Sequence, residues 1–178
     1  MTYIEDGTCR LISRKQNQYK SFDPLAASLA KLPVKNARID SEIVVLDAEG
    51  KSVFLDLMRR RRAGAILYCF DLLYHDGEDL RNLSLVDRKH RLQRLIRGHE
   101  RLLFADHIEN RGVEFFKTIC SQDLEGIVAK HKLAPYASTP QTWFKILNND
   151  YTQKRGRKEM FENFRERNSA AVHDAQNP

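Results

Sequence analysis

One stretch carries the strongest chemical signal in this 178-residue sequence: Leu124-Glu125-Gly126-Ile127-Val128-Ala129-Lys130. Its short apolar run between a carboxylate and an ammonium group predicts a buried strand over Gly126–Lys130. Side chains alternate between the two faces of a strand, so residues 126, 128 and 130 share a face and Lys130 can point into a pocket. Glu125 could help to hold a hard cation. Taken alone, this E-G-x-x-x-K pattern is explained equally well by a strand with charged ends.

Three other segments offer groups that suit a nucleotide. Trp143–Leu147 predicts a second strand, on which Lys145 lies between apolar neighbours. Two lysines on neighbouring strands would converge on phosphate as compact positive charges. Upstream, Ile39-Asp40-Ser41-Glu42-Ile43-Val44 offers a carboxylate where a strand begins, and Leu67–Gly77 contains Phe70, an aromatic ring that could stack on a base. Core packing is the alternative role for Phe70.

The rest of the chain alternates strand and helix signals. Asp6-Gly7 predicts a hairpin turn, and Asp23-Pro24 predicts a helix with Asp23 as N-cap that ends before Pro33. Ser84 and Asp87 resemble a capping box that opens a basic helix to about Arg97. The remaining expected elements are strands at 37–46, 65–73 and 102–105 and a helix at 112–121. This mixture indicates an α+β domain with mainly antiparallel sheets.

Composition narrows the function classes. No apolar run approaches the roughly 18 residues needed to cross a bilayer, and the first residues lack a signal-peptide pattern, so we expect a cytoplasmic protein. Three dispersed cysteines and six scattered histidines indicate neither a disulfide framework nor a zinc site. The net charge of +6 permits binding to phosphate-rich partners, with basic blocks at 59–62 and 154–158. On spacing alone, a solvated face explains each block better.

Together and in this order, the segments resemble the signature of ATP-dependent DNA ligases, within the covalent nucleotidyltransferase superfamily. Ile39–Val44 resembles the family's D-G-E segment, Leu67–Gly77 its F-D-L-L-x-x-D-G segment, Leu124–Lys130 its E-G-x-x-x-K segment and Trp143–Leu147 its W-x-K-x-K segment. Leu11–Asn17 is similar to the S-R-N-G stretch that follows the nucleophile motif. The five motifs occur in the family's order and spacing.

The resemblance implies a fold and a domain division. The expected fold is an α+β nucleotidyltransferase core, ATP-grasp-like, of antiparallel sheets flanked by helices and lacking its first elements. Residues 1–161 would form a partial adenylation domain, and residues 162–178 would form a polar C-terminal tail.

The resemblance also implies site residues, cofactors and a partner. Glu42 would bind the ribose, Phe70 would stack on adenine, and Lys130 and Lys145 would contact the α-phosphate of ATP. Glu125 would help to place Mg²⁺, and Arg14 would touch nucleotide or DNA phosphate. The implied cofactors are ATP or AMP and Mg²⁺, and the implied partner is double-stranded DNA with nicks, with no membrane involved. Further arginines expected on nucleic-acid phosphate are Arg60, Arg61, Arg155 and Arg157.

The nucleophile of this family is missing from the sequence. Family members attack ATP with the lysine of a K-x-D-G motif, whereas no lysine precedes Lys15 here. We therefore expect that the motif would lie upstream of Met1 and that this chain does not form the covalent adenylate. Ser41 stands where the family has Gly, Leu147 replaces the second lysine of W-x-K-x-K, and Gln16-Asn17 replaces Asn-Gly. Too few residues follow Lys145 for the OB-fold domain of most ligases.

Several functions remain open at this point. The first is a DNA-joining protein that binds ATP or AMP, with residual sealing of pre-adenylated nicks. The second is a non-catalytic nucleic-acid or nucleotide-binding module, and the third is an inactive remnant. An RNA ligase or a capping guanylyltransferase fits less well, because the Phe70-Asp71-Leu72-Leu73 and Ser13-Arg14 segments resemble the DNA ligase branch more closely.

Overall fold

The computed structural model describes residues 1–48, 50, 52, 64–136 and 142–152. The chain divides into two compact units. Unit 1 comprises Met1–His107 and His131–Thr142, and unit 2 comprises Ile108–Lys130 and Trp143–Pro178. The predicted phosphate-binding residues Arg60, Arg61, Arg155 and Arg157 lie outside the described residues.

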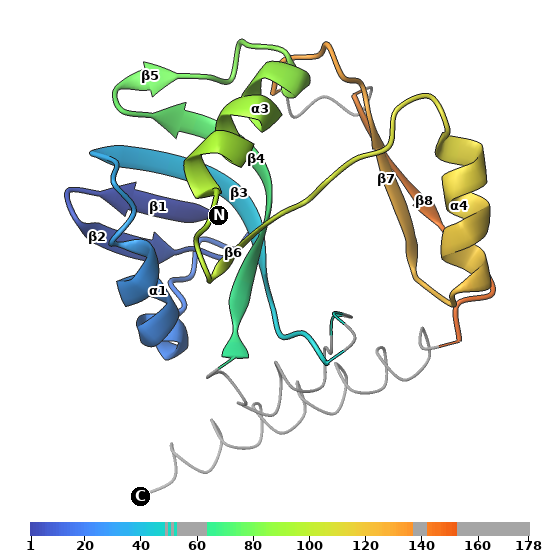
Figure 1. The fold of residues 1–178 in the computed structure, drawn as a ribbon, viewed down its shortest axis with the longest axis horizontal. Helices are drawn as coiled ribbons and strands as arrows, with labels where there is room; N and C mark the ends of the chain where they lie inside the picture. Colours follow the sequence, from blue (N-terminus) through green and yellow to red (C-terminus); the bar gives the residue numbers. More distant parts are fainter. Residues whose placement is uncertain (49, 51, 53–63, 137–141, 153–178) are drawn as a thin grey trace, which may run out of the picture. The chain divides into compact units, whose positions relative to one another are not determined.

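A mixed sheet forms the frame of unit 1 (Figure 1). Its strands are β1 (Thr2–Glu5), β2 (Thr8–Leu11), β3 (Asn36–Val44), β4 (Ile66–His75), β5 (Glu78–Asp79) and β6 (Leu102–Phe104). Within the described residues, the order is β2-β1-β3-β4-β5, and β6 also pairs with β4. All pairings are antiparallel except β4 with β6, which is parallel. The expectation of a mainly antiparallel sheet is confirmed.

Two Asp-Gly turns close hairpins of this sheet, one of them between β1 and β2 as predicted. Asp6 and Gly7 have φ values of 46° and 73°, and Asp76 and Gly77 have φ values of 45° and 90°. Asp and Gly tolerate this left-handed region, which tight hairpin turns require. The Asp76 carboxylate also accepts hydrogen bonds from the Lys35 and Asn36 amides, and these bonds lower its pKa.

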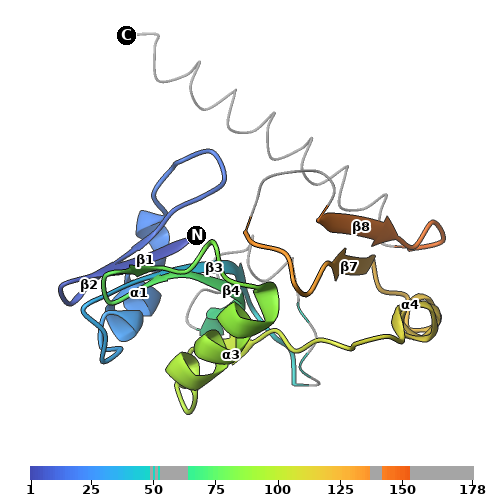
Figure 2. The same ribbon diagram turned by 90° about the horizontal axis from the view of Figure 1, so that it is seen from above.

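Two helices pack on one face of the sheet and bury the core of unit 1 (Figures 1 and 2). A 3-10 turn, η1 (Lys20–Phe22), leads into α1 (Asp23–Leu29), and α3 (Leu85–Ile96) lies alongside β4. The core includes Ile4, Leu25, Leu29, Ile39, Leu67, Leu72, Leu92 and Ile96. Burying an aliphatic side chain of this size stabilises a fold by about 1.5–3 kcal/mol.

The predicted start of α1 is wrong by one residue. Phe22, not Asp23, occupies the N-cap position, and no side chain caps this helix. Asp23 already has helical φ and ψ values of −54° and −39°. The preceding 3-10 turn has already bent the chain into a helical path, so Asp23 and Pro24 occupy the first turn instead.

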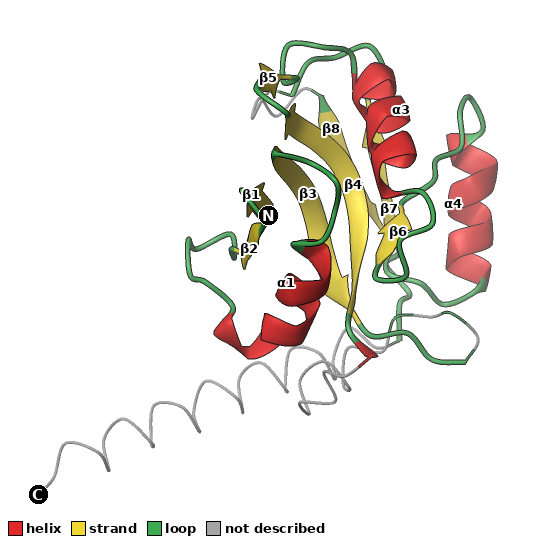
Figure 3. Cartoon of the chain, turned by 60° about the vertical axis from the view of Figure 1, so that its left-hand side comes forward, coloured by secondary structure: helices red, strands yellow, loops and turns green. Residues whose placement is uncertain are grey.

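Unit 2 consists, in its described part, of one helix and a two-stranded ribbon (Figure 3). The helix α4 (Gly112–Ser121) contacts β7 (Gly126–Lys130), which pairs antiparallel with β8 (Trp143–Leu147). All three boundaries agree with the sequence prediction. The predicted burial of the Gly126–Lys130 strand is wrong, because none of its residues is fully buried and Val128 is 54% exposed. No helix in the described part of the chain is both long and apolar enough to span a membrane.

Candidate functional site

The two predicted phosphate-binding lysines lie on one face of the β7–β8 ribbon. Lys130 is opposite Trp143 in the register, and Lys145 is opposite Val128. Residues directly opposite each other in an antiparallel pair share a face, and so do residues 128 and 130 on one strand. Lys130 and Lys145 therefore project from the same side, as their expected role requires.

Each lysine has a defined neighbour on this ribbon. The Lys145 Nζ atom lies 2.6 Å from Glu125 Oε1, with both side chains partly exposed to solvent. The Lys130 Nζ atom lies 3.9 Å from the ring centroid of Trp143, which is a cation–π distance. These contacts hold both ammonium groups in place, and they bring Glu125, the predicted metal-binding residue, into contact with Lys145.

Gly126 is the residue that allows the ribbon to close. Its φ of +144° lies in a region that L side chains rarely adopt. A Cβ atom at this position would lie 2.1 Å from the Ile146 carbonyl oxygen and 2.9 Å from the Leu147 Cα atom. The glycine of the E-G-x-x-x-K pattern is thus required by the close approach of β8.

Polar contacts hold the chain after β8 against the start of β7. The buried Asn148 amide side chain donates to the Leu124 carbonyl, and the Asn148 backbone N–H donates to the Glu125 carbonyl. The Asp123 carboxylate accepts bonds from the Thr152 hydroxyl and amide, and these bonds lower its pKa. These bonds hold the backbone of Asp123–Glu125 against the chain after β8.

In unit 1, the predicted ribose-binding and adenine-stacking residues come from the paired strands β3 and β4. Glu42 is opposite Tyr68, and the Tyr68 ring meets the Phe70 ring edge-on at a centroid distance of 5.6 Å. Phe70 is half-buried and is not among the residues of the core cluster. The sheet therefore places a carboxylate and two aromatic rings near one another on β3 and β4.

A buried ion pair lies beside Phe70. Asp71 and Arg88 are both fully buried, and two bonds of 2.9 and 2.8 Å join the Arg88 guanidinium to the Asp71 carboxylate. Asp71 also accepts a bond from the Leu72 amide. Arg88 was expected only as part of a basic helix, and its burial was not predicted. A charged residue inside the otherwise apolar run Leu67–Leu73 was the available signal, because a buried carboxylate needs a partner.

The chain that follows β7 packs on the start of α3. The Ala134 carbonyl accepts bonds from the Leu85 amide and Arg88 Nη1, and the Lys132 carbonyl accepts one from the Val86 amide. The Tyr136 ring lies 5.8 Å from the Arg88 guanidinium. The pKa of Tyr136 is raised to about 12, mainly by burial of the phenol. The negative charge of the nearby Asp40, which is hydrogen-bonded to Tyr136, raises it further. Tyr136 was also missed by the sequence interpretation.

Two departures from the family pattern have a clear place in the structure. Ser41, where a glycine was expected, shares a 2.9 Å hydroxyl–hydroxyl hydrogen bond with Thr2 of β1. Arg14 is exposed in the turn that follows Ile12. This turn is closed by a 2.8 Å hydrogen bond from the Ser13 amide to the Asn17 carbonyl. Gln16 in this turn has a φ of 63°, a conformation in which Asn or Gly would be less strained.

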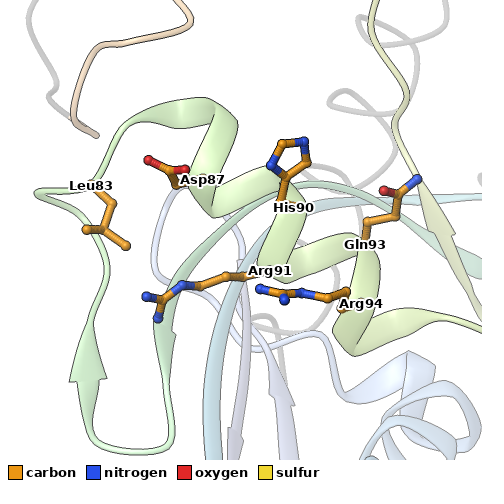
Figure 4. Close-up of a pocket in the computed structure, with 6 residues that line it drawn as sticks. All are labelled: Leu83, Asp87, His90, Arg91, Gln93 and Arg94. Atoms are coloured by element: carbon orange, nitrogen blue, oxygen red, sulfur yellow. The ribbon is translucent and has the colours of Figure 1, made fainter.

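A cavity of about 620 Å³ lies on α3 and does not involve the predicted site residues (Figure 4). Its lining residues are Leu83, Asp87, His90, Arg91, Gln93 and Arg94. Arg91 is paired with Glu78 at 2.6 Å, and Asp87 is bonded to the Ser84 hydroxyl. Arg91 and Arg94 point in the same direction from the helix, and His90 points away from them. None of the residues predicted to bind the nucleotide lines this cavity.

The described residues hold no group of three or more His, Cys, Asp or Glu side chains suited to a metal ion. Glu125 offers one carboxylate, already in contact with Lys145. Mg²⁺ is commonly held by one or two carboxylates together with substrate phosphates and water. The residues present therefore fit Mg²⁺ only when nucleotide phosphates complete its coordination.

Comparison with known proteins points to a single family. Residues 1–146 match the model described as "ATP dependent DNA ligase domain". The chain is 35% identical over 154 residues to the multifunctional non-homologous end joining protein LigD of Pseudomonas aeruginosa. It is 30% identical over 156 residues to the SPbeta prophage-derived DNA ligase-like protein LigB of Bacillus subtilis. These alignments cover 82% and 83% of the chain, but 18% and 57% of the relatives.

Solved structures give the same result and confirm the predicted fold. The ligase domain of Mycobacterium tuberculosis LigD matches with a TM-score of 0.69 and 27% identity, over 82% of this chain and 50% of that one. A mycobacterial DNA ligase D complexed with ATP and MES matches with a TM-score of 0.67 and 28% identity, over 81% and 49%. The chain thus spans about half of each structure.

Proposed function

Because the chain belongs to the ATP-dependent DNA ligase domain family, we propose that it binds ATP or AMP for DNA joining. The proposed nucleotide ligands are Glu42, Phe70, Lys130 and Lys145. The observation that carries this proposal is the shared face of Lys130 and Lys145 on the β7–β8 ribbon. The complex of a related mycobacterial ligase with ATP supports the choice of nucleotide. We extend the domain to residues 1–161, with 162–178 as a polar tail.

Each proposed ligand has a distinct chemical task. Lys130 and Lys145 offset the negative charge of the α-phosphate, where an ammonium group acts as a compact point charge. Phe70, already in edge contact with Tyr68, offers its ring face to adenine. Glu42 accepts hydrogen bonds from ribose hydroxyls as a carboxylate. Arg14, exposed in its turn, contacts nucleotide or DNA phosphate.

Glu125 would hold Mg²⁺ together with the phosphates of the nucleotide. The ion would supply positive charge where phosphate bonds are made or broken. Lys145 contacts Glu125 at 2.6 Å. We propose that phosphate draws Lys145 away from this carboxylate, which then becomes available to the cation.

The covalent half of the ligase reaction requires a lysine of a K-x-D-G motif, and the 178 residues contain no such motif. We propose that this chain does not adenylate itself. It would still bind a nick whose 5′-phosphate already carries AMP. In sealing such a nick, the 3′-hydroxyl oxygen attacks the 5′-phosphorus, the hydroxyl proton leaves, and AMP departs with the electrons of the broken phosphoanhydride bond.

Two assays of the purified chain test this proposal. With α-labelled ATP and Mg²⁺, we expect no acid-stable, lysine-linked label on the protein. With a pre-adenylated nicked duplex, we expect sealing that requires Mg²⁺ and is lost in Lys145→Ala but retained in Lys117→Ala, which changes an exposed lysine of α4. Lysine-linked label would refute the absence of self-adenylation, and equal sealing by both variants would refute the role of Lys145.

A second candidate function is a non-catalytic nucleic-acid or nucleotide-binding module. The absence of K-x-D-G and the basic blocks at 59–62 and 154–158 favour it. Binding to nicked duplex DNA should then weaken steeply with added salt, because each phosphate contact releases counterions. Binding without sealing of the pre-adenylated nick would favour this module over the joining function, and the absence of both would favour an inactive remnant. In either case, we propose a cytoplasmic protein that acts in DNA repair or recombination.

A further inference from the structure

The carboxylates Asp40 and Asp71 lie within the proposed nucleotide-binding segments of β3 and β4, but neither is a proposed nucleotide ligand. Asp71 is fully buried against Arg88, and Asp40 is hydrogen-bonded to the Tyr136 hydroxyl. Each aspartate neighbours a proposed ligand in the sequence, since Asp71 follows Phe70 and Asp40 precedes Glu42 by two residues. Their partners Arg88 and Tyr136 lie outside all the sequence motifs.

Arg88 also holds one stretch of backbone, Lys132–Tyr136, which we call the return segment and whose last residue is Tyr136. Arg88 Nη1 donates to the Ala134 carbonyl as well as to the Leu83 carbonyl. The Leu85 and Val86 amides of the first turn of α3 donate to the Ala134 and Lys132 carbonyls. The first amides of a helix have no partner within the helix, so the return segment satisfies two of them.

The return segment begins two residues after Lys130. These bonds form one network. It links Asp71, which follows Phe70, and Asp40, which precedes Glu42, to the start of α3 and to the return segment, which continues the chain from Lys130. We infer that Arg88 and Tyr136 are positioning residues of the nucleotide site. They act through Asp71, Asp40 and the return segment, and neither is expected to touch the nucleotide. This inference rests on the proposed function.

The main variant is Tyr136→Phe, which removes the hydroxyl bond to Asp40 and keeps the ring beside Arg88. We expect the dissociation constant for ATP with Mg²⁺ to rise by about tenfold, the range in which positioning residues couple to a ligand. Calorimetry or the emission of Trp143, the single tryptophan, can follow binding, because the Lys130 ammonium lies over its ring. Tyr19→Phe, at an exposed tyrosine, is the matched control and should bind as the wild type does.

A second pair of variants separates positioning from general stability. Arg88→Lys keeps the charge but cannot make the paired bonds to Asp71, so both the melting temperature and the ATP affinity should fall. Leu25→Ala removes a buried side chain of α1 and should lower the melting temperature while leaving the dissociation constant for ATP unchanged. Circular dichroism confirms folding of each variant at the temperature of the titration.

The outcomes distinguish this inference from the proposed function. If the wild type binds ATP and Tyr136→Phe has the same dissociation constant, the positioning role is overturned and the proposed function is left intact. Weakening of the same size in Leu25→Ala also overturns it, because stability alone would then explain the loss. Absence of ATP binding by the folded wild-type chain overturns both.

Discussion

At the scale of single residues, the candidate site depends on a few side chains with special local geometry. Gly126 permits the approach of β8, and Glu125 and Lys145 form a contact on the same ribbon. Arg88 and Tyr136 lie outside the motifs, yet they contact the aspartates beside two proposed ligands. The motifs therefore identify the groups proposed to touch the nucleotide, and the structure adds residues that hold the strands carrying them.

Substitution of Gly126 by alanine should destabilise the β7–β8 ribbon. The new Cβ atom would meet the Ile146 carbonyl oxygen at 2.1 Å, and the φ of +144° would be strained by about 1–3 kcal/mol. Chemical denaturation measures the loss. The matched control is Gly98→Ala, which also has a positive φ of 76° but no atom within 4 Å of the new Cβ. Equal losses in the two variants would contradict the importance of the close approach.

Tyr136 should make stability depend on pH in the alkaline range. Its pKa of about 12 lies above the ordinary value of 10.0, so the unfolded chain releases this proton first. Tyr136 makes its full contribution to the free energy of unfolding below pH 10, and this contribution is lost as the pH rises towards 12. In denaturation between pH 10 and 12, Tyr136→Phe should lose stability less steeply than the wild type. Tyr19→Phe should retain the wild-type slope, and a wild-type slope in Tyr136→Phe would contradict the assignment.

At the scale of elements, helix starts show both what local sequence fixes and what it does not. Ser84 caps α3 as predicted, because its hydroxyl oxygen accepts a 3.2 Å hydrogen bond from the Asp87 backbone N–H. Asp23 does not cap α1, because the 3-10 turn before it sets the backbone path. The first turn of α3 further depends on the distant carbonyls of Lys132 and Ala134.

The cap of α3 can be tested directly. Ser84→Ala removes the acceptor of the Asp87 amide bond and should cost about 1 kcal/mol of unfolding free energy. Ser121→Ala in α4 is the control, because the Ser121 hydroxyl only donates to the Thr118 carbonyl on an exposed surface. Its effect should stay within about 0.5 kcal/mol. Equal losses in urea denaturation would mean that the cap contributes no more than an ordinary surface hydroxyl.

The strands illustrate the same division between local and long-range information. The limits of β7, β8 and α4 followed from apolar runs and their flanking residues. The parallel pairing of β6 with β4 and the register shifts between β3 and β4 depend on contacts between distant segments. The motifs predicted Glu42, Phe70, Lys130 and Lys145 as ligands. Asp71 within its apolar run indicated that a buried carboxylate would need a partner, but the sequence did not identify Arg88 as that partner, because the pair depends on packing between α3 and β4.

At the scale of the whole molecule, the proposed ligands are divided between two compact units. Glu42 and Phe70 belong to unit 1, and Glu125, Lys130 and Lys145 belong to unit 2. Glu42 and Phe70 lie on the antiparallel pair β3–β4, Lys130 and Lys145 lie on the antiparallel pair β7–β8, and Glu125 directly precedes β7. The chain belongs to the ATP-dependent DNA ligase domain family, and nucleotide binding by these groups is the proposal on which the whole account depends.

Calorimetric titration of the 178-residue chain with ATP and Mg²⁺ tests this property most directly. We predict binding by the wild type, a dissociation constant raised about 10- to 100-fold in Lys145→Met, and no change in Lys117→Met. Lys145 is 60% exposed, so its substitution should leave the fold intact, as a melting curve can verify. A wild-type dissociation constant in Lys145→Met, or no binding by the folded wild-type chain, would contradict the account.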